Sequence, residues 1–259
     1  MKNLKRILFV ALLLPFFGID GVFAEIKMPK IFGDNMVLQQ KSEVLIWGWA
    51  KADAQVQVKS SWNGKNYSTK SNTNGEWKIK IETPEASKTA YVLSISDGKT
   101  LTLNNVLIGE VWLCSGQSNM EMPMKGYPDQ PIEGGLDAVA SSKNNFIRLF
   151  TVKQASTLNP QNDVEGQWFE SDPSSVRNFS ATAYFFGRLL SQNLDIPIGL
   201  IHSSWGGSKI EAWMSPEAMQ DFPQKKIPST ESDIKNKNQD PTLLYNGMIN
   251  PIVGYGLRG

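Results

Sequence analysis

Two adjacent stretches decide the fold of the second half of the chain. The apolar run Leu107-Ile108-Gly109-Glu110-Val111-Trp112-Leu113 leads directly into Cys114-Ser115-Gly116-Gln117-Ser118-Asn119-Met120. The first stretch predicts a buried strand, and the second predicts a polar turn at its carboxyl end. Residues 181–193 have the spacing of a helix with Ser180 as N-cap, and the apolar run 196–201 is typical of a central parallel strand. This order predicts an α/β domain over residues 106–259.

The preceding region, residues 25–105, follows a different period. Its turn dipeptides Asn63-Gly64, Asn74-Gly75 and Asp97-Gly98 separate short runs such as Gln55-Val56-Gln57-Val58. In runs of this kind, alternate side chains point to the core and to water. Regularly spaced turns between alternating runs predict an N-terminal β-sandwich.

The composition agrees with two folded domains. Of the 259 residues, 41% are hydrophobic and 20% are charged, which excludes an intrinsically disordered or collagen-like chain. The 26 basic and 25 acidic residues nearly cancel, so the chain lacks the excess of positive charge that binds nucleic acid or an anionic membrane surface. We expect neither as a partner.

The first 24 residues predict a secretory signal peptide. Lys2, Lys5 and Arg6 precede the apolar run 7–17, and small residues end the segment at Ala24. The run is too short to span a bilayer, which needs about 20 apolar residues. We therefore expect an exported protein, periplasmic or extracellular. Its single cysteine, Cys114, cannot form an intramolecular disulfide and is expected to be a buried hydrophobic residue.

Two loops are candidates for chemistry. Ser118 lies in the turn after the first apolar strand, and Ser203-Ser204-Trp205-Gly206-Gly207-Ser208 follows the second. Because parallel strands end at the same edge of a sheet, the two loops are expected to lie close together. A serine hydroxyl beside backbone N–H groups suits attack on an ester carbonyl. Taken singly, each loop is also compatible with a tight turn that binds nothing.

Both loops resemble the sialate O-acetylesterase family of SGNH-type hydrolases. The resemblance rests on residues 111–120 and 198–213, and it extends to residues 31–40 and 244–251. It implies a carbohydrate esterase that removes acetyl groups from sugar hydroxyls, with Ser118 as nucleophile. By the same comparison, the Ser118 N–H and one of Gly206 or Gly207 bind the oxyanion. It implies no metal or other cofactor.

The substrate implied is an O-acetylated sugar, and five residues near the loops are candidates to contact it: Gln117, Asn119, Trp205, Glu211 and Trp213. Indole rings offer flat apolar walls to a ligand. For Glu211, an exposed acidic residue near a helix start is the simpler interpretation. The tryptophans of the N-terminal runs, Trp47, Trp49 and Trp77, are assigned to the core.

The sequence also departs from the family pattern. The family's additional oxyanion asparagine and its Asp-x-x-His pair have no counterpart in these residues, and His202 is the only histidine. A serine needs a base within hydrogen-bond reach, so the base is either His202 or a histidine that this chain lacks. We therefore expect an α/β domain that is incomplete at its carboxyl end. The alternative function is a non-catalytic glycan-binding protein or an inactive fragment.

Overall fold

The structure, a computed structural model, describes residues 25–259. The predicted signal peptide, residues 1–24, lies outside the described residues. No helix within residues 25–259 is long and apolar enough to cross a membrane.

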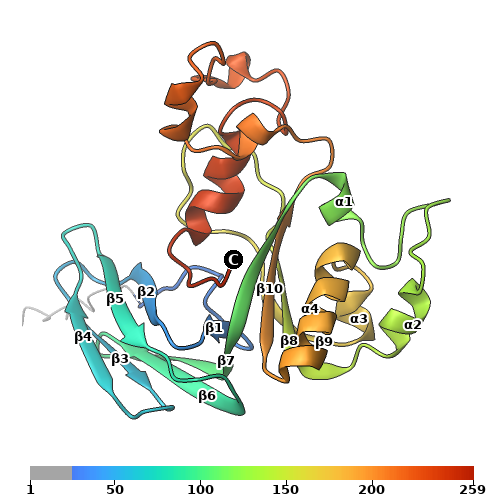
Figure 1. The fold of residues 1–259 in the computed structure, drawn as a ribbon. Coiled ribbons are helices and arrows are strands. Elements are labelled where there is room, and N and C mark those ends of the chain that lie inside the picture. The colour runs from blue at the N-terminus through green and yellow to red at the C-terminus, as the bar shows by residue number, and fades with distance from the viewer. Residues whose placement is uncertain (1–24) are drawn as a thin grey trace, which may run out of the picture.

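The fold is built on a mixed eight-stranded sheet in the order β4-β3-β6-β7-β10-β8-β9, with β1 also paired to β7, and on a two-stranded sheet of β2 and β5 (Figure 1). The strands are β1 (Val37–Gln39), β2 (Glu43–Trp49), β3 (Gln55–Ser60), β4 (Asn66–Lys70), β5 (Glu76–Glu82), β6 (Ser87–Ser96), β7 (Thr100–Gly116), β8 (Asn144–Thr151), β9 (Trp168–Ser171) and β10 (Ile198–Ser204).

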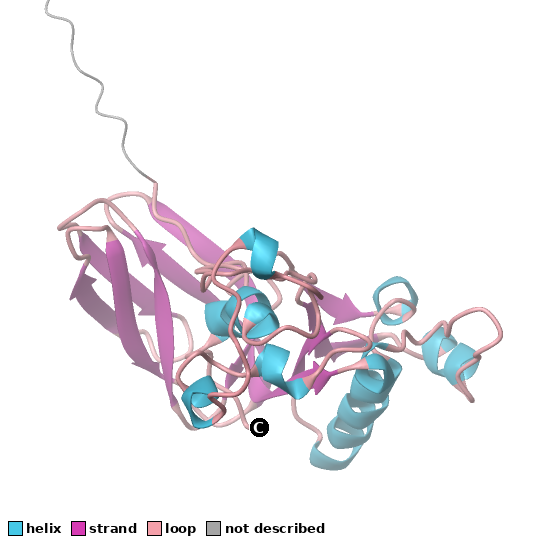
Figure 2. Ribbon diagram, turned by 90° about the horizontal axis from the view of Figure 1, so that it is seen from above, coloured by secondary structure: helices cyan, strands magenta, loops and turns pink. Residues whose placement is uncertain are grey.

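Within residues 25–259 every helix follows β7; α1 to α4 lie at the end of the molecule opposite strands β2 to β6, and the short helical turns after β10 lie between the two ends (Figures 1 and 2). The α-helices are α1 (Ser118–Glu121), α2 (Gly135–Ala140), α3 (Pro173–Val176) and α4 (Ala181–Leu194). Shorter helical turns follow β10: η1 (Ile210–Trp213), η2 (Ala218–Asp221), η3 (Glu231–Asp233), η4 (Tyr245–Ile249) and η5 (Asn250–Ile252).

Strand β7 connects the two halves of the fold. Its first part pairs antiparallel with β6, and its last seven residues pair parallel with β10, from Glu110 opposite Ile198 to Gly116 opposite Ser204. The predicted boundary between residues 105 and 106 falls inside this strand. The two halves therefore share one continuous backbone ladder.

The N-terminal strands also share a core with the second half. Buried side chains of β2 and β5, including Val44, Ile46 and Ile81, belong to the same apolar cluster as Val58 of β3 and Ile95 of β6. The small β2–β5 sheet is thus buried against the antiparallel part of the large sheet. Division of the chain into a sandwich and a catalytic domain stays a prediction.

Strand β10 is buried along its whole length. Leu200 packs in the cluster of α4, whereas its neighbour Ile201 packs in the cluster that contains Leu244 and Met248 of the C-terminal segment. Because successive side chains of a strand point to opposite faces, helices cover both faces of the sheet here. This is the environment predicted for a central parallel strand, and the mixed sheet with covering helices confirms an α/β fold.

Helix α4 was correctly predicted, and its buried face is set by its contact with β10. Ser180 caps the helix by accepting a hydrogen bond from the Ala183 N–H at 3.1 Å. Leu189 is 60% exposed, while Gly187 lies against Leu200 of β10. The close approach of the small residue rotates the buried face away from Leu189.

A glycine-to-alanine change tests the junction of β7 and β10. A Cβ at Gly109 would lie 2.0 Å from the backbone oxygen of Pro197, the same oxygen that accepts the Glu110 N–H. Backbone cannot yield as a side-chain tip can, so we expect Gly109→Ala to lower the free energy of unfolding by about 1–3 kcal/mol or more in urea titrations. Gly33→Ala is the matched control, because its nearest neighbour would be 3.9 Å away. Equal stability of the two variants contradicts this account.

Candidate active site

The chain turns sharply where β7 ends. Gly116, the last residue of the strand, has φ +145°, a backbone conformation that residues with a Cβ rarely adopt. Helix α1 then begins at Ser118, whose side chain is exposed and donates from Oγ to the Gln117 Oε1 at 3.2 Å. The turn therefore presents the Ser118 hydroxyl at the carboxyl edge of the sheet.

The glycine loop after β10 lies beside this serine, as the sequence predicted. The Trp205 N–H donates to the Gly116 carbonyl at 3.1 Å, which continues the β7–β10 pairing into the loops. A Cβ at Gly206 would lie 3.7 Å from the Ser118 Cα. Residues 88 positions apart in the chain are thus neighbours at the sheet edge.

Glu121 was missed by the sequence analysis, and it holds the two loops together. Its Oε2 accepts the Gly206 N–H, and its Oε1 accepts from Gln154 Nε2 at 2.6 Å. A Cβ at position 206 would lie 2.5 Å from Oε2, so a larger residue there would displace the Glu121 carboxylate. The one signal in the sequence was the three-residue spacing from Ser118, which places both on neighbouring positions of one helical turn.

Two further residues fix the glycine loop from the other side. Asn238 donates from Nδ2 to the Gly206 carbonyl at 2.7 Å, and Gln239 from Nε2 to the Gly207 carbonyl at 3.2 Å. Gly207 itself has φ +71°, in the left-handed region. Asn238 and Gln239 come from the polar stretch before Pro241.

His202 is buried next to the site but faces another serine. It is 7% exposed, its Nε2 is 2.6 Å from the Ser204 Oγ, and its ring meets the edge of Phe179 at 5.6 Å between centroids. Burial lowers its pKa to about 4, an effect that the charge of Glu121 partly offsets. At neutral pH the imidazole is therefore uncharged and paired with Ser204 rather than with Ser118.

Four of the other predicted site residues fall into an exposed pair and a half-buried pair. Gln117 and Asn119 are exposed on either side of Ser118. Trp205 and Trp213 are half-buried and pack against the larger apolar cluster. The Trp213 indole N–H donates to Ser208 Oγ at 2.9 Å, which orients that ring.

Glu211 makes an ion pair with Lys225 in a cavity that Ser118 does not line. Its carboxylate lies 2.7 Å from Lys225 Nζ, and this hydrogen bond lowers the Glu211 pKa. The pair lines a cavity of about 410 Å³ to which neither Ser118 nor Gly206 contributes. Its role as a substrate contact stays a prediction.

The arrangement of the potential metal ligands is the next feature of the site. Within residues 25–259, no group of three or more His, Cys, Asp and Glu side chains is placed to hold an ion. Cys114 is buried, and burial raises the pKa of its thiol to about 12, so it is an unreactive core residue, as expected.

A mixed sheet with helices on both faces, and a serine and a glycine loop at its edge, define an α/β hydrolase-like protein. The sequence model described as "Carbohydrate esterase, sialic acid-specific acetylesterase" matches residues 108–248. Sialate O-acetylesterases from Pongo abelii and Homo sapiens are each 30% identical over 253 residues, covering 90% of this chain and 47% of theirs. The chain belongs to this family of carbohydrate esterases.

A solved structure is similar as well. A crystal structure described as a novel carbohydrate acetylesterase from Xanthomonas citri has a TM-score of 0.79 and 34% identity, covering 91% of this chain and 50% of that one. The chain therefore spans about half the length of the relatives that it matches.

The low pKa of His202 makes stability depend on pH. Its ordinary pKa is 6.5 and its value in the fold is about 4, so between these values the unfolded chain binds a proton that the folded chain does not. We expect stability to fall by about 2 kcal/mol from pH 7 to pH 5, measured by urea unfolding. His202→Gln should remove most of this slope, because the chain has no other histidine. An unchanged slope in the variant contradicts the assignment.

Removing the Glu121 carboxylate should loosen the glycine loop. Hydrogen bonds to charged acceptors contribute about 1.5–3 kcal/mol, so in Glu121→Ala we expect amide exchange at Gly206 to be faster by about tenfold or more. Glu121→Gln keeps an oxygen acceptor and should remain closer to the original protein. Hydrogen exchange read by NMR or mass spectrometry measures the difference. Equal protection in all three proteins would show that Glu121 does not hold the loop.

Proposed function

We propose that the protein hydrolyses acetyl esters on sugar hydroxyls, with Ser118 as the nucleophile. The observation that carries this proposal is the exposed Ser118 hydroxyl beside Gly206, in a chain that belongs to a carbohydrate esterase family. The relatives are named sialate O-acetylesterase, so O-acetylated sialic acid is the first substrate to test. Acetylated xylan and pectin present the same carbonyl group and are the next candidates.

In the proposed reaction, Ser118 Oγ attacks the acetyl carbonyl carbon while a base takes the hydroxyl proton. The tetrahedral intermediate collapses, the bond to the sugar oxygen breaks, and the sugar leaves with the proton. Water then attacks the acetyl-serine ester and releases acetate, which restores the Ser118 hydroxyl. Both steps develop negative charge on the carbonyl oxygen, which needs hydrogen-bond donors at the sheet edge.

Of the two glycines proposed as oxyanion donors, the geometry favours Gly207. The Gly206 N–H already donates to the Glu121 carboxylate, a stronger acceptor than a neutral ester. We therefore assign the donors to the Ser118 N–H and the Gly207 N–H. A donor of this kind is typically worth ~10²–10³ in rate.

The base of this reaction has two candidates. His202 is neutral at pH 7, as a general base must be, but its Nε2 is engaged with Ser204. For His202 to serve Ser118, that bond would have to break. The geometry therefore favours the other sequence candidate, the Asp-x-x-His pair that the family resemblance implies, over His202.

The finer assignments of fold and location belong to the same proposal. The core shared by the β2–β5 sheet and strands β3 and β6 supports a β-sandwich beside an SGNH-type domain. The positive residues and apolar run at the N-terminus support export. Mass spectrometry of the mature protein tests export, with Glu25 as the expected first residue.

Replacing the nucleophile gives the decisive test. The assay uses a protein that carries this chain together with the Asp-x-x-His pair. We expect acetate release from O-acetylated sialic acid, followed by a coupled acetate assay, to fall to background in Ser118→Ala and to persist in His202→Gln. Circular dichroism at pH 7.5 establishes that both variants are folded. Activity that survives in Ser118→Ala, or no release of acetate from any acetylated sugar by this folded protein, overturns the proposal.

A further inference from the structure

A cavity of about 650 Å³ lies away from Ser118, between the β2–β5 sheet and two later segments of the chain. Residues 161–162 and 250–253 form its far wall. None of the residues predicted for the active site lines it, and Figure 1 shows β2 and β5 at the opposite end of the molecule from α1. Any ligand of this cavity would therefore bind at a second site.

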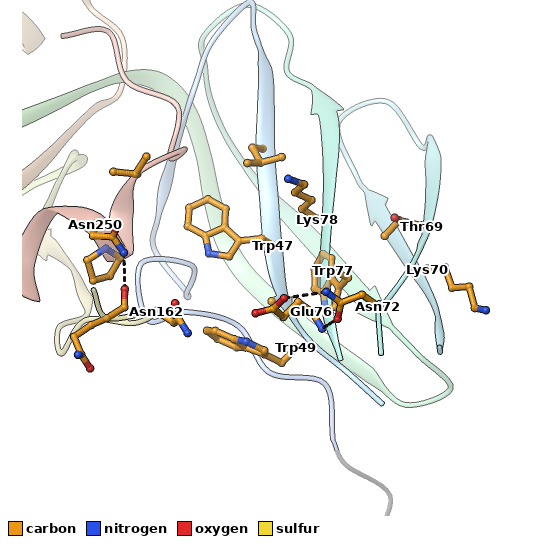
Figure 3. Close-up of a pocket in the computed structure, with 15 residues that line it drawn as sticks. Trp47, Trp49, Thr69, Lys70, Asn72, Glu76, Trp77, Lys78, Asn162 and Asn250 are labelled. Carbon is orange, nitrogen blue, oxygen red and sulfur yellow. Dashed lines mark hydrogen bonds between the residues drawn. The ribbon is translucent and has the colours of Figure 1, made fainter. Parts of the chain in front are cut away.

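Successive side chains of β2 point alternately to the core and to this cavity. Val44 and Ile46 are buried, whereas Trp47 and Trp49 are half-buried and line the cavity. Both indole rings project from β2 toward Asn250 and Asn162 (Figure 3). Trp47 packs against the core cluster, as assigned, but it also lines the cavity, and Trp49 is corrected from a core residue to a cavity residue. Two aromatic faces on one side of a strand form a ready apolar platform.

The ring of Trp47 is half-buried, and its contact with Phe32 holds it in place. Phe32 meets it edge to face, with 4.6 Å between ring centroids. An ordered side chain loses little conformational entropy when a ligand packs on it. Trp77, in contrast, is 3% exposed, and its indole N–H has no hydrogen-bond partner within the described residues. Trp77 therefore belongs to the core, as predicted, and the aromatic platform consists of Trp47 and Trp49.

Polar groups surround the tryptophans at positions set by the strand register. Glu76 is paired with Trp49 and Lys78 with Trp47 across the β2–β5 ladder. The Glu76 carboxylate accepts from Asn72 Nδ2 at 2.9 Å, and the Asn250 amide donates to the Gln161 carbonyl at 2.9 Å (Figure 3). These bonds orient a carboxylate and an amide at the edge of the aromatic platform.

We propose that this cavity binds a neutral sugar ring of a glycan. An apolar ring face would pack on Trp47 and Trp49, and its hydroxyls would bond to Glu76, Asn162 and Asn250. The wall carries the opposite charges of Glu76 and Lys78, and its other charged residue, Lys70, is paired with Asp53 at 3.0 Å, so no unpaired charge selects an anion. The site would hold a glycan chain to the enzyme at a point remote from the acetyl group that Ser118 attacks.

Titration calorimetry with unacetylated cellohexaose, xylohexaose and mannohexaose tests this site independently of esterase chemistry. We expect at least one oligosaccharide to bind both the original protein and Ser118→Ala, and binding to weaken by about tenfold or more in Trp49→Ala and in Trp47→Ala. Trp62→Ala is the matched control, since Trp62 is half-buried in the same region but does not line the cavity.

Glu76→Gln tests whether a loss of binding could come from unfolding. Because Glu76 is exposed and glutamine has nearly the same size, the variant should stay folded. It too should weaken binding while leaving the melting temperature within a degree or two of the original. The proposal is overturned if no oligosaccharide binds the folded protein at millimolar concentration. It is equally overturned if binding survives in the Trp47, Trp49 and Glu76 variants, which would place the sugar elsewhere.

Discussion

The parallel pairing of β7 with β10 is the constraint on which the rest of the molecule depends. It places Gly116 opposite Ser204, and both loops that leave the sheet there are the ones that carry the candidate chemistry. The first part of the same strand pairs with β6 and thereby joins the N-terminal half to the sheet. A change in its register would therefore move Ser118 relative to Gly206 and disturb the core of both halves at once.

At the sheet edge, a negative charge rather than a positive one organises the site. Glu121 accepts the Gly206 N–H and a side-chain N–H of Gln154, so its carboxylate joins the glycine loop to a third segment of the chain. Its charge also acts on the buried ring of His202, where it opposes the effect of burial on the pKa. The carboxylate thus couples the geometry of the glycine loop to the electrostatics beneath it.

The two proposed sites lie at opposite ends of the molecule. Ser118 lies on an open edge with small neighbours, whereas the tryptophan cavity lies between β2, β5 and the C-terminal segment. Asn250 and Val253 close that cavity only because the C-terminal segment returns to the N-terminal sheet. Each end thus uses residues from distant parts of the sequence.

Local pattern was enough to predict strands β7 and β10, alternating N-terminal strands such as β3, helix α4, the serine turn and the glycine loop, because each depends on neighbours within a few residues. Strands β8 and β9 were not predicted. The polar end of β10 escaped prediction: His202, Ser203 and Ser204 break the apolar pattern, and they are buried only because β7, β8 and helices surround them. The change of period near residue 105 suggested a domain boundary, although one strand continues through it. The partners Glu121, Gln154 and Asn238, and the tryptophan cavity, were decided by tertiary structure alone, because hydrogen bonds and cavity walls join residues that the sequence does not place side by side.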